Sequence, residues 1–142
     1  MTTSKQGLAL IAAHESLRLK AYLCPAGVPT IGYGHTKGVR MGDTITPDQA
    51  DKFLREDSAD AEKAVNAQDL KINQNQYDAL VSFTFNVGVG NFGKSTLLKK
   101  VKANPDDPAI RNEFARWNKG GGKVLPGLTR RRKEEADLYF KK

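Results

Sequence analysis

The helix predicted from position 46 onwards constrains this chain more than any other feature. Thr46 is a good capping residue, Pro47 suits the first helical position, and Gln49 can close a capping box. Apolar side chains then recur at helical spacing, which predicts a helix to about Gln68. Because this helix stands between two unlike parts of the sequence, it is the element placed to join them, and we expect a cleft between the two parts.

The part before the long helix combines a short helix with a hairpin. Thr3 and Gln6 can form a capping box, and the apolar spacing that follows predicts a first helix of about three turns. From position 17 to 23, apolar and polar residues alternate, which is typical of a strand. The segment 24–29 holds turn-forming proline and glycine, so 30–34 is the expected second strand.

The part after the long helix has helical patterns throughout. Asn73 and Gln76 can cap a central helix through Tyr77 to Val87, which is apolar on nearly every side. Glycines at 88, 90 and 93 interrupt it. We then expect a short helix from Ser95 or Thr96 to about Ala103, a helix opened by Asp107 and Pro108 that carries Phe114 and Trp117, a flexible connector at 120–122, and a final helix from Thr129 to Phe140.

These elements predict an α+β fold whose strands are confined to one small lobe. We expect a single domain over residues 1–142, which is long enough to bury a core without disulfide or metal staples. The small lobe would occupy about 16–45 and the connecting helix about 46–68. The larger helical lobe would comprise about 69–142 together with the N-terminal helix.

Composition and spacing exclude several classes of protein. Cys24 is the single cysteine, so no intrachain disulfide can form, and two histidines beside it do not make a usual four-ligand zinc site. The early apolar run, Leu8 to Ala13, is far shorter than the roughly 18–20 residues of a membrane span, and it is too short for a secretory signal. Three glycines match the dinucleotide pattern GxGxxG, but they follow a helix and not a strand. We therefore expect no metal, no cofactor and no membrane span.

The formal net charge of +7 predicts attraction to an anionic partner, such as nucleic acid, a membrane surface or a bacterial wall. The alternative is that this charge only keeps the protein soluble. Specific nucleic-acid binding is disfavoured, because the aromatic residues fall at core-like positions and do not interleave with basic ones. The basic run at 130–133 is typical of a solvated helix face, although one of its arginines could reach a buried carboxylate such as Glu15.

Glu15 is the first candidate for catalysis. It occupies the next position on the apolar stripe of the first helix, where burial would favour the neutral, protonated carboxyl group. A protonated carboxylic acid can act as the general acid of glycoside hydrolysis. The alternative is that Glu15 is merely the exposed last residue of the helix.

Cys24 and Thr30 bracket the turn of the predicted hairpin, so we expect them to face each other across the two strands and to share a pocket with Glu15. The alternatives are a small buried cysteine and an ordinary strand threonine. His35 and Asp57 are the other polar residues that need partners, and we expect an ion pair between them that joins the small lobe to the long helix.

Several segments together resemble the phage-type lysozymes of glycoside hydrolase family 24. They are His14-Glu-Ser-Leu-Arg18, Ala21-Tyr22, Thr30-Ile-Gly-Tyr-Gly-His-Thr36, Ser82-Phe-Thr-Phe-Asn-Val-Gly88, Ser95-Thr-Leu-Leu98, Trp117 and Gly127-Leu128. The likeness covers nearly the whole chain and is greatest to endolysins of lambdoid and related phages. It implies a lysozyme-like fold and hydrolysis of the β-1,4 bond between N-acetylmuramic acid and N-acetylglucosamine in peptidoglycan, which lyses the host cell.

The family motif is Glu, eight residues, Asp, five residues, Thr, and this chain has Glu15, Cys24 and Thr30 at that spacing. The resemblance implies that Glu15 is the general acid, that residue 24 activates or places the attacking water, and that Thr30 positions it. Cys24 replaces the family's aspartate, and an ordinary thiol is a poorer base at neutral pH. The alternatives are therefore a lytic transglycosylase or an inactive peptidoglycan-binding module.

The resemblance also implies residues that contact the substrate. Thr36, Phe85, Asn86 and Ser95 match positions that line the sugar cleft, and Trp117 matches an aromatic residue beneath it. For the two aromatic residues, core packing is the favoured alternative. By the same analogy we expect a monomer whose partner is peptidoglycan, held in the host cytoplasm until a holin releases it to the periplasm or cell wall.

Overall fold

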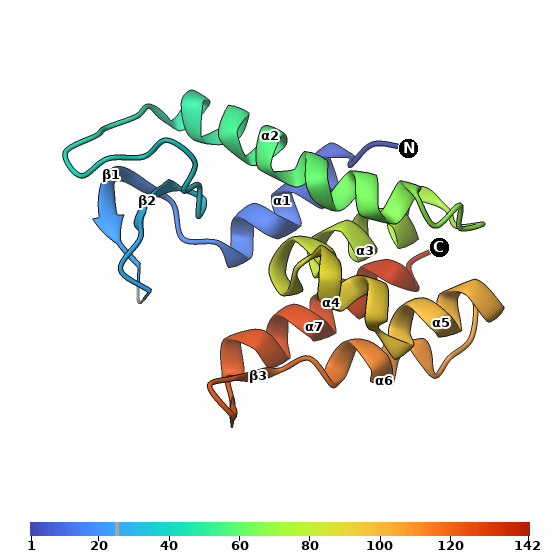
Figure 1. Cartoon of the computed structure of the whole chain (residues 1–142). Coiled ribbons are helices and arrows are strands. Elements are labelled where there is room, and N and C mark those ends of the chain that lie inside the picture. Colours follow the sequence, from blue (N-terminus) through green and yellow to red (C-terminus); the bar gives the residue numbers. More distant parts are fainter. Residues whose placement is uncertain (25) are drawn as a thin grey trace.

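The computed structural model of this chain describes residues 1–24 and 26–142 (Figure 1). Its elements, in chain order, are α1 (Lys5–His14), β1 (Arg18–Leu23), β2 (Pro29–Gly32), α2 (Pro47–Asn66), α3 (Gln74–Val87), α4 (Val89–Lys94), α5 (Thr96–Ala103), α6 (Ile110–Ala115), β3 (Lys119–Gly120), β4 (Lys123–Val124) and α7 (Pro126–Tyr139). The α+β class is confirmed. We call β1, β2 and the segments that flank them the β lobe, and α1 with α3–α7 the helical body.

Two of the predicted capping boxes begin the longest helices. The Thr46 hydroxyl accepts a hydrogen bond from the Gln49 backbone N–H, and the Gln49 side-chain oxygen accepts one from the Thr46 backbone N–H. Asn73 and Gln76 form the same reciprocal pair at the start of α3. The predicted box at Thr3 is wrong, because Ser4 is the residue that caps α1. Thr3 is buried instead and binds the Glu62 carboxylate on α2, so its side chain ties the first residues to the long helix.

The β lobe holds the expected hairpin in a different register. β1 and β2 are antiparallel, and Thr30 lies opposite Tyr22. Cys24 and Thr30 are therefore diagonal neighbours and not direct partners, because the turn closes one step later with the Cys24 amide donating to the Val28 carbonyl. Pro25, in the same turn, lies outside the described residues. β2 ends at Gly32, and paired backbone hydrogen bonds between Ile31 and His35 close a tight turn.

Two glycine-rich segments that we expected to be irregular are regular elements. Gly90 and Gly93 lie within α4, which follows a break at Gly88. The glycines at 120–122 belong to the β3–β4 hairpin, where Gly121 and Gly122 have φ of 59° and 80°. Such positive values suit a tight hairpin turn, so these glycines form a defined turn and not a flexible connector. The last helix begins at Pro126, earlier than the predicted Thr129.

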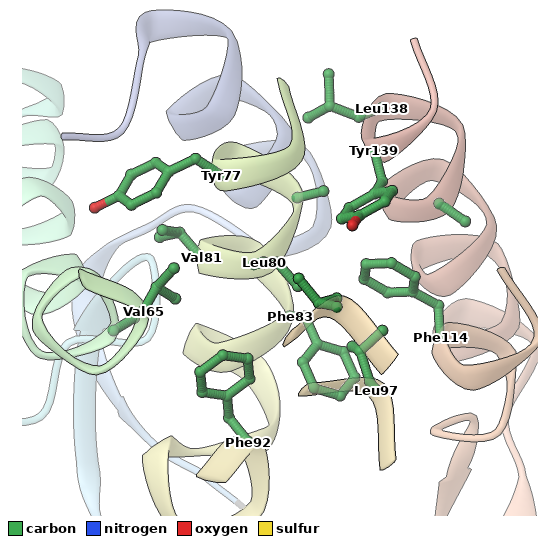
Figure 2. Close-up of a cluster of buried hydrophobic side chains, with 14 of the residues drawn as sticks. Val65, Tyr77, Leu80, Val81, Phe83, Phe92, Leu97, Phe114, Leu138 and Tyr139 are labelled. Atoms are coloured by element: carbon green, nitrogen blue, oxygen red, sulfur yellow. The ribbon is translucent and has the colours of Figure 1, made fainter. Parts of the chain in front are cut away.

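The core of the molecule lies in the helical body around α3 (Figure 2). Phe83 is fully buried, and its ring meets those of Phe114 and Trp117 edge to face, each at 5.6 Å between centroids. α2 runs along one side of this core and continues past it to the β lobe (Figure 1). α2 therefore contacts both the helical body, through α3, and the β lobe, through β2.

The predicted ion pair at the junction is confirmed. His35 Nδ1 lies 2.8 Å from Asp57 Oδ2, and the His35 ring stacks on Phe53 with 4.0 Å between centroids. Asp57 and Phe53 both belong to α2 and lie one turn apart, so they hold the imidazole from one face of the helix. This contact joins the β lobe to α2 by a hydrogen bond and by stacking.

Candidate active site

Glu15 lies at the C-terminal end of α1, where the helix gives way to the β lobe. It is the capping residue of that helix, with extended φ and ψ, so it is not a further member of the helical apolar stripe. Its side chain is 24% exposed, which keeps the carboxylate accessible. Glu15 Oε1 accepts a hydrogen bond of 2.9 Å from Nη1 of Arg131. The carboxylate is therefore placed at the junction of the two parts and held by a cation.

The arginine that reaches Glu15 belongs to the basic run at 130–133, which we expected to be a solvated helix face. That expectation is wrong for two of its members, because Arg131 and Arg132 are 3% and 1% exposed. Both extend from α7 towards α3: the Glu135 carboxylate accepts from each of them, and the Ser82 carbonyl on α3 accepts from Arg131. Nε of Arg132 is buried and has no hydrogen-bond partner among the described residues. The sequence pattern does not distinguish which arginine meets Glu15, and the geometry assigns Arg131.

Beside Glu15 the surface is hollowed into a pocket of about 510 Å³. His14, Arg130 and Glu134 contribute charged or titratable groups to its wall, and Asn86 and Leu128 also line it. His14 Nε2 lies 2.9 Å from a Glu134 carboxylate oxygen. Burial lowers the pKa of His14, with a smaller effect of Arg131 in the same direction and of Glu134 in the opposite one. Neither His14 nor Glu134 was predicted from the sequence as a residue of this site.

Gly34 follows the hairpin and brings its backbone close to the same carboxylate. Its φ is +84°, a conformation that side chains other than glycine rarely adopt. A Cβ at this position would lie 3.7 Å from Glu15 Oε2. The turn after β2 thus runs directly past Glu15, so the β lobe and the end of α1 share this site.

Cys24 and Thr30 lie together on the hairpin. The backbone N–H groups of Val28 and Ala26 lower the pKa of the Cys24 thiol, and the Thr30 hydroxyl adds a smaller effect. The Thr30 hydroxyl also donates a 2.9 Å hydrogen bond to the Val28 carbonyl. The turn thus favours the thiolate form of Cys24 more than an ordinary peptide does.

The four residues proposed for substrate contact differ in their surroundings. Thr36 and Asn86 are exposed, and Asn86 accepts a hydrogen bond from Arg132. Phe85 is half-buried and packs against the core, as does Trp117. Ser95 caps α5 by accepting from the Leu98 amide, and it also lines a second pocket of about 310 Å³ near Trp117.

The described residues hold no site of two other kinds. Residues 1–24 and 26–142 contain no group of three or more histidine, cysteine or acidic side chains arranged to hold a metal ion. Within the same ranges, no helix combines the length and the apolar character needed to cross a membrane.

Comparison with known proteins gives relatives over the whole chain. The chain is 46% identical over 144 residues to the endolysin of Acyrthosiphon pisum secondary endosymbiont phage 1, covering 98% of each. It spans 54% and 55% of the length of two Bacillus phage endolysins, from phages B103 and PZA. Several other relatives are named SAR-endolysins.

Comparison with solved structures also finds proteins with the same fold along the whole chain. The muramidase domain of SpmX from Asticaccaulis excentricus matches with a TM-score of 0.92 at 37% identity, covering 99% of each chain. A mutant of P22 lysozyme matches with a TM-score of 0.89 at 36% identity, again covering 99% of each chain. The lysozyme-like form of the fold is confirmed by these neighbours. The family model described as phage lysozyme matches residues 12–135, and this chain belongs to the phage lysozyme family.

Proposed function

We propose that Glu15, Cys24 and Thr30 carry out the reaction of this chain. As a phage lysozyme, the protein is an endolysin muramidase, which hydrolyses the β-1,4 bond between N-acetylmuramic acid and N-acetylglucosamine in peptidoglycan and lyses the bacterial cell. The observation that supports the assignment of Glu15 is its accessible carboxylate beside a pocket, bound by the buried guanidinium of Arg131. Glycoside hydrolysis requires a carboxylic acid that can protonate the leaving-group oxygen, and a carboxyl group in this position can do so.

Glu15 acts as the general acid. The bond that breaks joins the anomeric carbon to the glycosidic oxygen, and this oxygen leaves as a hydroxyl group once it has received a proton from Glu15. The carboxylate that remains on Glu15 carries a negative charge next to Nη1 of Arg131. Arg131 therefore stabilises the product state of the proton transfer, since a nearby cation favours an ionised carboxylate.

Cys24 and Thr30 serve the water that completes the reaction. The water oxygen bonds to the anomeric carbon and loses one proton, which the Cys24 thiolate accepts, while the Thr30 hydroxyl holds the water in place. The lowered pKa of Cys24 supports this role, because it raises the fraction of thiolate at neutral pH. A thiolate positioned in this way replaces the aspartate that the family motif has at this position.

Substrate contacts are assigned with the same four residues. Asn86 and Thr36 offer exposed polar groups to sugar hydroxyls or acetamido groups. Ser95 contributes through the second pocket near Trp117, which it lines, and Phe85 is assigned on the resemblance to the family. Single alanine substitutions at Asn86 and Thr36 should raise KM more than they lower kcat, since they remove binding and leave the reacting groups in place.

The proposal is tested by mass spectrometry of fragments released from purified peptidoglycan. Wild type should produce new reducing N-acetylmuramic acid ends, and Glu15→Gln, which keeps the shape but cannot supply the proton, should produce none. Glu56→Gln, at an exposed position of α2 outside the lining of this pocket, is the matched control and should retain cleavage. Anhydro ends would contradict hydrolysis, and cleavage by folded Glu15→Gln would contradict the acid role.

Cys24→Asp separates the two possible roles of residue 24. If this residue is the base, the carboxylate should extend activity to lower pH, because a carboxylate ionises well below a thiol. The acidic limb of the pH profile of kcat/KM, measured on soluble peptidoglycan fragments, should then move to lower pH. An unmoved acidic limb would mean that residue 24 only places the water.

The last part of the proposed function is the passage of the enzyme from the host cytoplasm to the cell wall. A phage endolysin acts on the cell wall after release. We assign this chain to the endolysins that wait in the host cytoplasm as monomers until a holin opens the inner membrane. Expression without a holin should leave cells intact, and co-expression with one should lyse them. Lysis in the absence of any holin would contradict this route, and light scattering coupled to chromatography checks the oligomeric state.

A further inference from the structure

Glu135 is a buried carboxylate that the reaction described above does not use. It lies on α7 one turn after Arg131 and is 0% exposed. One of its oxygens, Oε2, accepts from Ser82 Oγ at 2.5 Å and from Arg131 Nε at 3.2 Å. The other, Oε1, accepts from Arg132 Nη1 at 2.7 Å. Both oxygens are therefore engaged, and two cations flank the group.

Arg131 is held by this carboxylate on the side away from Glu15. Its Nε faces Glu135, and its Nη2 donates to the Ser82 carbonyl at 3.2 Å. Its Nη1 is then the edge that points to Glu15, at 2.9 Å. Because the guanidinium is planar and rigid, fixing two of its edges on α7 and α3 fixes the direction of the third. Residues inside the helical body thus fix the position of the guanidinium edge that binds Glu15.

The charges in this cluster balance. Glu15 and Glu135 supply two negative charges, and Arg131 and Arg132 supply two positive ones. Burial raises the pKa of Glu135, and the ion pairs with Arg132 and Arg131 oppose that effect. If Glu135 lost its charge, Arg131 would act on Glu15 alone. Glu15 would then release its proton more readily and would hold it over a narrower range of pH.

We propose that Glu135 is a positioning residue for Glu15 that acts through Arg131, both by orienting the guanidinium and by sharing its positive charge. The inference rests on the proposed function of Glu15 as the proton donor. It assigns to a buried residue, without contact to the substrate site, control over the pH range in which the acid is protonated.

Other charged groups around the cluster act on the same carboxylate and are kept constant in the test. From α1, His14 precedes Glu15, and from α7, Glu134 and Arg130 line the same pocket. α3 contributes the polar groups of Ser82 and Asn86. On α6, which packs against α7, the charged groups pair elsewhere, Arg111 with Asp137 and Glu113 with Arg116.

The primary test is Glu135→Gln, which preserves the shape and removes the charge. The alkaline limb of kcat/KM, where the acid must still hold its proton, should move to lower pH by about one unit, the lower end of the usual effect of an adjacent opposite charge. The NMR signal of the Glu15 side-chain carboxyl should move to lower pH by the same amount, in protein without substrate. The proposal would be overturned if both the Glu15 titration and the alkaline limb of kcat/KM were the same in Glu135→Gln as in wild type.

Two variants separate positioning from general damage. Glu135→Asp keeps the negative charge and should return the limb towards its wild-type position. Asp78→Asn alters another fully buried carboxylate, one that binds Ser4 at the far end of α1, and should lower stability without moving the limb. A limb that moves equally in Asp78→Asn would mean that loss of stability alone is responsible, which would overturn the proposal.

A second background guards against misfolding of Glu135→Gln, which leaves Arg132 buried without its carboxylate. Arg132→Met and the double variant Arg132→Met with Glu135→Gln differ only in the Glu135 charge, and neither buries an unpaired Arg132. The double variant should titrate Glu15 at lower pH than the single variant. Equal titration in the two proteins would overturn the proposal.

The proposed function and the further inference fail differently. If Glu15→Gln retains cleavage, the acid assignment fails, while the NMR titration still reports whether Glu135 controls the Glu15 carboxyl. If Glu15→Gln is inactive and the Glu135 variants leave the titration unchanged, the function stands and the inference fails.

Discussion

The helical body fills its interior with large apolar side chains, whereas the β lobe has almost none to bury. Tyr77, Phe83 and Phe114 are each at most 1% exposed in the body. Among the described residues of the lobe, Ile31 and Ala21 are buried, and half-buried Tyr33 packs against the core. Most other large apolar side chains there remain exposed: Leu17, Leu19, Leu23, Val28 and Met41. Burial of apolar area therefore stabilises the helical body, whereas the fold of the lobe depends on the hydrogen bonds of its hairpin and on its attachment to α2.

This contrast indicates where each function of the molecule is placed. Cys24 and Thr30, which we propose to serve the water, both lie in the lobe, and Glu15 lies where the lobe meets the body. Arg131, which binds Glu15, and Glu135, which binds Arg131, belong to the helical body. Loss of the lobe's attachments should impair the placement of water before it affects the fold of the helices.

The largest effect is expected from a cavity in the body. Phe83→Ala removes a fully buried ring that contacts Phe114 and Trp117, and should lower the free energy of unfolding by about 3–5 kcal/mol. Leu23→Ala, at an exposed position of β1, should change it by less than about 0.5 kcal/mol. Urea denaturation of the two variants measures both values. Similar losses would remove the distinction between body and lobe.

A smaller effect is expected at the junction. Asp57→Asn replaces the charged partner of His35 and should cost about 1.5–3 kcal/mol, the usual contribution of a hydrogen bond to a charged group. Hydrogen exchange should accelerate at the amides of β1 and β2 and remain unchanged in α3. Asp60→Asn, exposed on the same helix, is the control. Equal acceleration in α3 would show that the junction stabilises the whole molecule.

Next comes a change confined to the lobe. Alkylation of Cys24 with iodoacetamide should lower kcat/KM at least tenfold, or about 1.4 kcal/mol of transition-state stabilisation, and leave the helical circular dichroism unchanged. Because its pKa is lowered, the thiol should react at half its maximal rate at a pH below that of free cysteine. The single cysteine makes the modification specific. Full activity after complete alkylation would exclude an essential thiol.

The smallest effect is expected at Tyr77 in the body. Burial, with a contribution from Glu62, raises the pKa of Tyr77 to about 12, and its hydroxyl donates to the Met1 carbonyl at 2.9 Å. The unfolded chain loses this proton near pH 10, so stability should fall as pH rises from about 10 to 12. Tyr77→Phe should lose about 1 kcal/mol at pH 8 and show a flatter decline. Urea midpoints at a series of pH values test this, and parallel declines would contradict it.

Local chemistry was sufficient to predict the helix starts and the alternation of the hairpin. Capping at Thr46 and Asn73 depends on residues three apart, so the sequence contains the whole signal. The same rule misplaced the start of α1 because two candidates, Thr3 and Ser4, are adjacent. A distant carboxylate on α2 binds Thr3, and this contact left the cap to Ser4.

The sequence indicated the candidate residues of the site but not the residues that hold them in place. Glu15, Cys24 and Thr30 followed from pattern and resemblance, but the register that makes Cys24 a diagonal neighbour of Thr30 depends on how the turn closes. Arg131 and Glu135 lie in a highly charged segment that is typical of a solvent-facing surface. Their burial depends on α7 packing against α3, which no local spacing specifies.

The turn at Gly34 limits how this enzyme can be altered. The added Cβ of any other residue would stand in van der Waals range of the Glu15 carboxylate, and the backbone there has a conformation that other residues resist. A side chain at position 34 would therefore lie against the carboxylate proposed to donate the proton, on the side that the glycine leaves open. The absence of a side chain at this turn thus sets the free space on the β-lobe side of Glu15.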